Sequence, residues 1–379
     1  MRILIINGPN LHLLGTREPE VYGTATLADI EKQWKSRAGL VGATVEPFQS
    51  NHEGSIIDVI SNAAGDFDGI VLNAGALTHY SYAIRDAVSA VGLPTVEVHI
   101  SNIYEREQWR HTSVLTEVCD TTIVGRGTNG YLNAIDHLVA LLSMPLEVIP
   151  YGDSGDNVLD LRTPAGLGPH PVALLIHGGF WRDIWKRDLM DPMAVDLASR
   201  GWATVNIEYH RGYESYSTAP SDVRSAVAWI REHAVEHDLD RERIVAIGHS
   251  AGGYLALQLA HDDTPIAGVL PLAGISNLLA ISESRPEDDP VAAFLGASHQ
   301  EAPRLWTQAE LSGHPNTPVH LVHGLNDDTV EPSLSESYLR LTGGAARSTI
   351  IPDCGHMELV DPFAACWPSV IAALEGLTR

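Results

Sequence analysis

RILIINGPNLHLLGTREPEVYG, residues 2–23, opens with a short apolar run and continues into a loop punctuated by Gly and Pro. The run, residues 2–7, predicts a buried strand, and the loop carries Asn10, Arg17 and Tyr22. A tyrosine titrates at about 10 in water, so a neighbouring arginine would let Tyr22 act as a phenolate near neutral pH. The stretch therefore predicts a loop that holds a base over a substrate.

Apolar runs and helical periodicity alternate from this strand to residue 143. Near-continuous apolar strands separated by helices predict a parallel sheet covered on both faces, with ligands beyond the carboxyl ends of its strands. The predicted strands are residues 2–7, 43–49, 69–73, 94–100 and 122–125, and the predicted helices are residues 26–37, 55–64, 81–91 and 130–142.

The pattern restarts after Met144 without a Gly/Ser-rich or Pro-rich linker, which predicts two domains, residues 1–144 and 145–379. Residues 282–315 are rich in Pro, Glu, Asp and His, and their weak periodicity predicts an inserted segment that could cap a site. The predicted strands of this half are residues 158–161, 172–177, 203–208, 244–248, 266–272, 319–323 and 348–351, and the predicted helices are residues 222–236 and 254–261.

Composition excludes several kinds of protein. A net charge of −24 and a pI of about 5.0 argue against a nucleic-acid partner, and an anionic substrate would need a local arginine cluster. Three cysteines without metal-ligand spacing predict reduced thiols, no metal site and a cytoplasmic protein. We expect neither a signal peptide nor a membrane partner, because the first apolar run is four residues long and no other approaches a membrane span.

Two predicted strands end in polar residues. LNAGALTHYS occupies residues 72–81, and EVHISN occupies residues 97–102. Glu97 and His99 lie on one face of their strand, where the carboxylate would hold the imidazole in one tautomer. A buried ion pair without a catalytic role is the alternative for this pair. Arg106 and Arg110 would face one anion if their segment is helical, and an exposed salt-bridged surface is the alternative for them.

Residues 1–143 resemble the type II dehydroquinases through six motifs in order: NGPNL, REPEVYG, QSNHEG, LNAGALTHYS, EVHISN and R-x-x-x-R. The resemblance implies a flavodoxin-like fold, assembly into trimers that pack as dodecamers, and dehydration of 3-dehydroquinate to 3-dehydroshikimate through an enolate. It implies no cofactor.

The resemblance also implies a role for each matched residue. Tyr22 would remove the substrate proton, Arg17 would lower the tyrosine pKa, and Asn10 would bind the water that stabilises the enolate. His99, oriented by Glu97, would protonate the departing hydroxyl. Asp86 would reach across a trimer contact. The implied substrate-binding residues are Asn73, Gly75, His79, Asp86, Ile100, Ser101, Arg106 and Arg110.

A second set of chemical motifs lies in the other half. GHSAG, residues 248–252, follows a predicted strand and precedes a predicted helix, which is the arrangement of a nucleophile elbow with Ser250 exposed at its turn. HGGFWR, residues 177–182, would supply an oxyanion hole from the backbone N–H groups of Gly178 and Gly179, together with that of Ala251.

The remaining members of a catalytic triad follow in the chain order Ser, Asp, His. His356 would be the base for Ser250, and Asp327 would orient it. Asp328 is an alternative acid, although the spacing H-G-x-x-D-x-x-V favours Asp327.

Residues 147–379 resemble α/β-hydrolases of the carboxylesterase type, and HGGFWR is similar to the branch that contains feruloyl esterases and kynurenine formamidases. This implies serine ester hydrolysis, and the fusion suggests an acylated quinate-type ester as substrate. The whole chain is thus predicted to be a bifunctional enzyme that forms homo-oligomers. The alternative is one active enzyme whose other domain serves as an oligomerising scaffold or a ligand-binding module.

Overall fold

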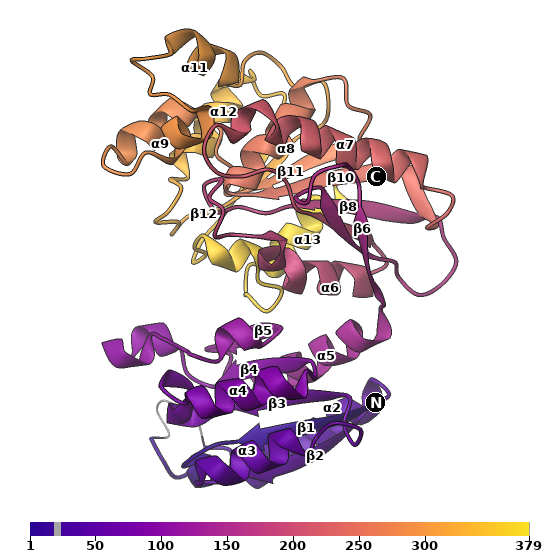
Figure 1. Cartoon of the computed structure of the whole chain (residues 1–379), viewed down its shortest axis with the longest axis vertical. Coiled ribbons are helices and arrows are strands. Elements are labelled where there is room, and N and C mark those ends of the chain that lie inside the picture. Colours follow the sequence, from indigo (N-terminus) through magenta and orange to yellow (C-terminus); the bar gives the residue numbers. More distant parts are fainter. Residues whose placement is uncertain (19–23, 379) are drawn as a thin grey trace. The chain divides into compact units, whose positions relative to one another are not determined.

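The computed structural model describes residues 1–18 and 24–378. The chain forms two compact units, residues 1–143 and 144–379 (Figure 1). Each unit contains one β-sheet with helices on both faces.

The first unit has a five-stranded sheet in the order β2-β1-β3-β4-β5, with every neighbouring pair parallel. This is the strand order of flavodoxin-like folds, so the predicted fold of this half is confirmed. Its strands are β1 (Arg2–Asn7), β2 (Thr44–Gln49), β3 (Gly69–Asn73), β4 (Thr95–His99) and β5 (Thr121–Val124), and its α-helices are α2 (Leu27–Leu40), α3 (Glu53–Ser61), α4 (Tyr82–Val91) and α5 (Asn129–Ser143).

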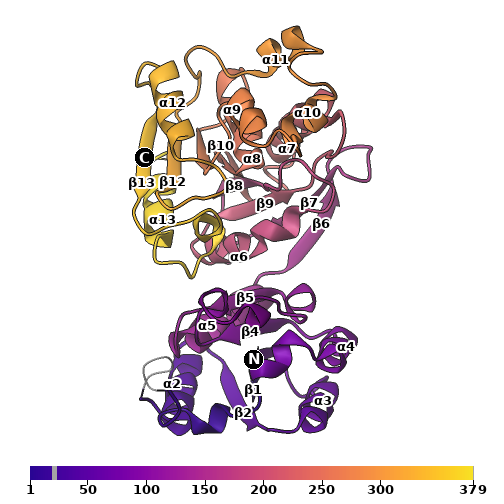
Figure 2. The ribbon, with the colours of Figure 1, turned by 90° about the vertical axis from the view of Figure 1, so that its left-hand side faces the viewer.

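Alternate side chains of these strands face opposite layers of helices. Leu4 and Ile6 of β1 pack in a buried cluster with residues of α3 and α4. On the other face, Trp34 of α2 contacts Tyr131 of α5, with ring centroids 4.6 Å apart. Figure 2 shows α3 and α4 together on one side of the sheet and α2 and α5 on the other.

The second unit has an eight-stranded sheet in the order β13-β12-β11-β10-β8-β9-β7-β6. Only β7 runs antiparallel to its neighbours β6 and β9, so the six strands from β9 to β13 are parallel. The predicted α/β-hydrolase fold is confirmed. The strands are β6 (Leu146–Pro150), β7 (Val158–Arg162), β8 (His170–Ile176), β9 (Ala203–Ile207), β10 (Leu239–His249), β11 (Gly268–Leu272), β12 (His320–Gly324) and β13 (Arg347–Ile351).

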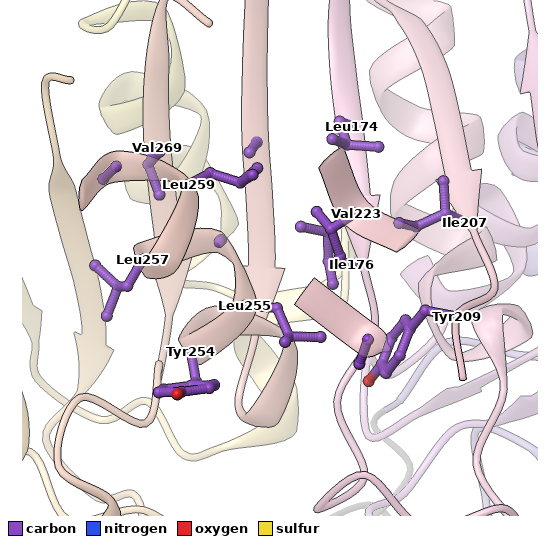
Figure 3. Close-up of a cluster of buried hydrophobic side chains, with 14 of the residues drawn as sticks. Leu174, Ile176, Ile207, Tyr209, Val223, Tyr254, Leu255, Leu257, Leu259 and Val269 are labelled. Atoms are coloured by element: carbon purple, nitrogen blue, oxygen red, sulfur yellow. The ribbon is translucent and has the colours of Figure 1, made fainter. Parts of the chain in front are cut away.

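Helices cover both faces of this sheet as well. The α-helices are α6 (Asp191–Ser199), α7 (Ala219–Glu232), α8 (Ala251–His261), α9 (Leu278–Ser284), α10 (Pro290–Leu295), α11 (Pro303–Ala309), α12 (Ser333–Leu341) and α13 (Trp367–Glu375). Leu174 and Ile176 of β8 pack in the cluster under α7 and α8, beside Ile207 and Val223 (Figure 3). The intervening Leu175 faces a second cluster formed with α6 and α13.

Three features of this unit differ from the pattern in the sequence. The boundary segment after Met144 forms the edge strand β6, and the helices α6, α12 and α13 were not predicted. Residues 282–315 contain the end of α9 and two further helices, α10 and α11. Each of these two has only six or seven residues, so a helical repeat barely develops, and its first turn is fixed locally by Pro290 or Pro303.

Candidate active sites

The first site is a cavity of about 240 Å³ beyond the carboxyl ends of β1, β3 and β4. Parallel strands bring these ends to one edge of the sheet, which is why motifs far apart in the sequence meet there. Nine predicted residues line the cavity: Asn10, Arg17, Asn73, Gly75, His79, His99, Ile100, Ser101 and Arg110. Apolar neighbours that were not predicted complete it: Pro9, Leu11, Leu14, Ala76 and Ile103.

The loop after β1 supplies one wall of this cavity. Asn10 has a φ of 68° and donates its backbone N–H to Asn51 Oδ1 at 2.9 Å. Arg17 Nε lies 3.0 Å from Glu18 Oε2, so a carboxylate accompanies the arginine there. Tyr22, the predicted base, lies outside the described residues.

A buried chain of hydrogen bonds fixes the polar ends of β1 and β3. Tyr131 donates its hydroxyl to Asn7 Oδ1 at 2.6 Å and accepts from Asn73 Nδ2 at 2.8 Å. The remaining Asn73 oxygen accepts the Gly75 N–H at 3.1 Å. These two hydrogen bonds hold the Asn73 side chain in one orientation, in which its amide nitrogen donates to the buried Tyr131 hydroxyl.

Glu97 and His99 form the most enclosed part of the site. His99 Nε2 lies 2.9 Å from Glu97 Oε1, and Glu97 is fully buried. The carboxylate also accepts hydrogen bonds from four hydroxyl groups, which belong to Thr78, Ser113, Thr116 and Thr122. Burial opposes ionisation of Glu97, but the hydrogen bonds from His99, Thr78 and Ser113 outweigh it and lower the pKa to about 2. His99 therefore faces the cavity beside a permanent carboxylate.

Four predicted binding residues lie in different surroundings. His79 Nδ1 lies 2.8 Å from the Thr112 carbonyl, and burial lowers the pKa of His79. Arg110 lines the cavity, whereas Arg106 is not among the lining residues. The segment is not one helix, because Arg110 ends a short 3₁₀ turn whereas Arg106 lies between two such turns. Both arginines approach Glu107, Arg110 at 2.8 Å and Arg106 at 3.6 Å. The fourth, Asp86, is exposed on α4 and is not among the lining residues either.

The second site is built around a sharp turn between β10 and α8. Ser250 has φ 54° and ψ −116°, a strained combination for a residue with a side chain and one typical of a nucleophile elbow. Its backbone N–H donates to the Leu272 carbonyl at 2.9 Å, and its carbonyl accepts from Ile275 at 3.1 Å. Ala251, the next residue, begins α8, so its N–H is free of the first intrahelical bonds.

The loop after β8 presses against this turn. A Cβ placed on Gly178 would lie 2.9 Å from both Ser250 Cβ and the His249 carbonyl oxygen, so only glycine allows this approach. The adjacent Gly179 has a φ of 106°. Behind the loop, His177 Nε2 lies 2.7 Å from Glu208 Oε1, and burial lowers the pKa of His177 to about 3.

The acid and the base of the predicted triad meet at the ends of β12 and β13. His356 Nδ1 lies 2.7 Å from Asp327 Oδ2, and the second Asp327 oxygen accepts the N–H groups of Thr329 and Val330 at 2.9 and 2.8 Å. Burial raises the pKa of Asp327, but hydrogen bonds with His323 and His356 outweigh it and hold the pKa well below its usual range. Asp328, the alternative acid, is exposed.

His249 joins the elbow to the base. Its ring centroid lies 4.5 Å from that of His356, and its Nε2 donates to the His356 carbonyl at 3.1 Å. Burial lowers the pKa of His249 to about 3, so the ring is neutral over most of the pH range. Sequence reasoning treated His249 as part of a motif and did not identify this contact.

Comparisons with known proteins follow the division into two units. Residues 1–139 match the family model described as Dehydroquinase class II, and residues 159–340 match the one described as BD-FAE. Catabolic 3-dehydroquinase 1 of Neosartorya fischeri is 56% identical over 136 residues, which make up 36% of this chain and 91% of that protein. A 3-dehydroquinate dehydratase of Bacillus cereus is 52% identical over 141 residues, 37% of this chain and 97% of that protein.

The second unit resembles a solved structure of a bacterial heroin esterase. The two share a TM-score of 0.50 and 26% sequence identity over 62% of this chain and 84% of the esterase. Within residues 1–18 and 24–378, no helix has the length and apolar character needed to cross a membrane.

These matches agree with the two folds. Because the chain spans 91% of a relative with which it shares 56% identity, it belongs to the class II dehydroquinase family, and it joins that domain to an α/β-hydrolase domain of the esterase type.

Proposed function

We propose that the chain is a bifunctional enzyme with two domains, residues 1–144 and 145–379. The first dehydrates 3-dehydroquinate to 3-dehydroshikimate, and the second hydrolyses an ester. The observation that carries the first activity is the ionised, hydroxyl-bound Glu97 beneath His99 at a cavity that Arg17 and Arg110 also line.

In the proposed dehydration, Tyr22 takes a proton from the carbon beside the substrate ketone, and the electron pair forms an enolate. Arg17 favours the tyrosinate form through its positive charge, and Asn10 binds the water that stabilises the enolate oxygen. His99 protonates the departing hydroxyl, which leaves as water and forms the double bond. Glu97 holds the His99 ring through Nε2, which leaves Nδ1 for the substrate.

Arg110 lines the cavity, and its guanidinium would bind the substrate carboxylate. The guanidinium carbon lies 4.0 Å from the Trp109 ring centroid. Arg106 and Asp86 are proposed to complete the site, Asp86 from a neighbouring subunit. The assembly would then be a homo-oligomer, a trimer or a dodecamer, built through the first domain. The mass of the purified chain in solution tests that assembly.

The test of the dehydratase is the growth of ultraviolet absorbance from the conjugated enone product. Wild-type protein should produce it, and Tyr22→Phe should lower kcat by at least about 100-fold because the base is removed. A wild-type protein without this activity would favour the alternative in which the first domain is a scaffold for the hydrolase.

The strained Ser250 turn, the Gly178 contact and the Asp327–His356 pair support ester hydrolysis. His356 would take the Ser250 proton as the hydroxyl attacks the ester carbonyl, and the N–H groups of Gly178, Gly179 and Ala251 would stabilise the oxyanion. Loss of the alcohol gives an acyl-enzyme, which water then hydrolyses. Ser250→Ala should abolish release of 4-nitrophenol from 4-nitrophenyl acetate.

We further propose an acylated quinate-type ester, such as a hydroxycinnamoyl ester, as the natural substrate. A panel of acyl esters at equal concentration tests this, and such an ester should give a higher kcat/KM than 4-nitrophenyl acetate. The absence of any preference would remove the proposed link between the two activities. The three free thiols, Cys119, Cys354 and Cys366, support a cytosolic setting for both reactions.

A further inference from the structure

The inserted segment packs on the loop that carries the proposed oxyanion hole. Phe180 and Trp181, directly after the two glycines, have φ values of 52° and 57°. The Trp181 ring stacks on Phe294 of α10 with centroids 4.1 Å apart and planes 8° from parallel. Residues with side chains rarely adopt positive φ, so contacts from outside the loop are needed to hold it there.

Arg285, at the end of α9, makes the second contact with this loop. Its guanidinium carbon lies 4.6 Å from the centroid of the Phe180 ring, within cation–π range. Its Nη2 also donates to the Thr329 carbonyl at 3.3 Å. Thr329 in turn donates its backbone N–H to Asp327 Oδ1 at 2.9 Å. One half-buried side chain therefore touches both the oxyanion loop and the loop of the triad acid.

We propose that Arg285 is a positioning residue of the hydrolase, which sets the oxyanion loop and the Asp327 loop relative to each other. The proposal rests on the proposed ester hydrolysis. A guanidinium suits this place because its flat face can lie on an aromatic ring while its edge donates to a carbonyl. A lysine retains the charge but lacks this planar fork.

A bridge between the two loops acts on kcat more than on KM. Oxyanion donors and an oriented His356 matter most when negative charge develops on the carbonyl oxygen, so a small displacement raises the barrier without weakening ground-state binding equally. The inserted segment would then contribute to the chemical step as well as covering the site.

The test compares Arg285→Ala and Arg285→Lys with Arg304→Ala, an exposed arginine on α11 of the same segment. With 4-nitrophenyl acetate, Arg285→Ala should lower kcat by about 10-fold or more and change KM by less than about 3-fold. Arg285→Lys should recover part of the lost rate, and Arg304→Ala should match wild type. Dehydratase activity of the same preparations and their unfolding midpoints show whether each variant is folded.

Phe180→Leu supplies a second, milder variant that removes the aromatic face and keeps apolar bulk. It should lower kcat, and adding Arg285→Ala to it should cost less than Arg285→Ala costs in wild type. A kcat within 2-fold of wild type for Arg285→Ala, or fully additive losses in the double variant, would overturn the proposal. If wild type and Ser250→Ala are equally inactive on esters, the proposed hydrolase itself fails, which is a separate outcome.

Discussion

Glu97 is a carboxylate that the protein keeps ionised in a place without solvent. Four hydroxyl groups and His99 share its two oxygens. Among these partners His99, Thr78 and Ser113 lower the pKa to about 2 despite burial. The carboxylate holds the His99 ring through Nε2, and the proposed dehydration uses that ring as its acid.

Glu97→Gln therefore tests whether charge, rather than shape, is required. The amide fills the same volume but cannot stay anionic, so we expect kcat for dehydration to fall about 100-fold with KM changed only a few-fold. Thr122→Val is the control, because its hydroxyl makes the longest hydrogen bond to the carboxylate, 3.2 Å, and three other hydroxyls remain. Kinetics within 3-fold of wild type for Glu97→Gln would contradict the assignment of His99 as acid.

His249 gives a pH dependence to the stability of the second domain. Its folded pKa is about 3 and its ordinary value is 6.5, so below pH 6.5 the unfolded chain takes up a proton that the folded protein does not. The contribution of His249 to the free energy of unfolding is fully present above pH 6.5. It falls by about 1.4 kcal/mol per pH unit as the pH is lowered toward 3. His249→Gln removes this contribution, while its amide can still donate to the His356 carbonyl.

Between pH 7.5 and pH 5, wild type should lose about 2 kcal/mol more unfolding free energy than His249→Gln. Urea unfolding followed by tryptophan fluorescence measures this, since six of the eight tryptophans lie beyond residue 143. His177 is present in both proteins and shifts in the same direction, so its contribution cancels. Parallel pH profiles for the two proteins would show that His249 does not become charged on unfolding in this range.

At the scale of residues, the motifs and the resemblance that they carry predicted nine of the residues that line the first cavity, but not the hydroxyl groups that bind Glu97. The four hydroxyls around Glu97 come from three separate segments, and no local pattern links Ser113 or Thr116 to a strand that ends at His99. Only the folded chain brings them together. The same holds for the contact between His249 and His356, which are more than 100 residues apart.

At the scale of elements, the loop after β8 and the β10–α8 turn are fitted to each other. A Cβ on Gly178 would meet Ser250 and the His249 carbonyl at 2.9 Å, closer than side-chain carbons normally approach. Gly178→Ala should displace the oxyanion loop and lower kcat for ester hydrolysis by about 100-fold or more, the cost of losing one oxyanion donor. Stopped assays with 4-nitrophenyl acetate measure this.

Gly155→Ala is the matched control for that change. A Cβ on Gly155 would meet nothing within 4 Å, so ester hydrolysis and dehydration should both stay at the wild-type level. Dehydratase activity also serves as an internal measure of folded protein for Gly178→Ala. An ester kcat close to wild type in Gly178→Ala would mean that this loop does not form the hole.

Buried elements were predicted from the sequence more accurately than exposed ones. Residues 3–6 of β1 and 172–176 of β8 are buried and form unbroken apolar runs, which the sequence reveals. The edge strand β6 is largely exposed and mixes apolar with polar residues, so its pairing with β7 left no such signal. The short helices α10 and α11 depend on local caps and on tertiary contacts, which periodicity does not report.

At the scale of the whole molecule, the described residues of each site come from one unit. The first cavity is lined by residues 9–110, and the second site draws on residues 177–356. The buried clusters described above likewise draw their members from one unit each. None of the described residues named in one site belongs to the other.

We therefore expect the two activities to be independent. Ser250→Ala should retain dehydration within 2-fold of wild type, and Tyr22→Phe should retain ester hydrolysis to the same degree, both measured on the same preparations. The proposed chemistry agrees, because a quinate-type ester would release an alcohol whereas the proposed dehydration removes a proton beside a ketone. An oxidation by another enzyme would then separate the two steps. Direct transfer between the sites would then bring no advantage. Loss of both activities in either variant, with the fold intact by circular dichroism, would instead show that the sites are coupled.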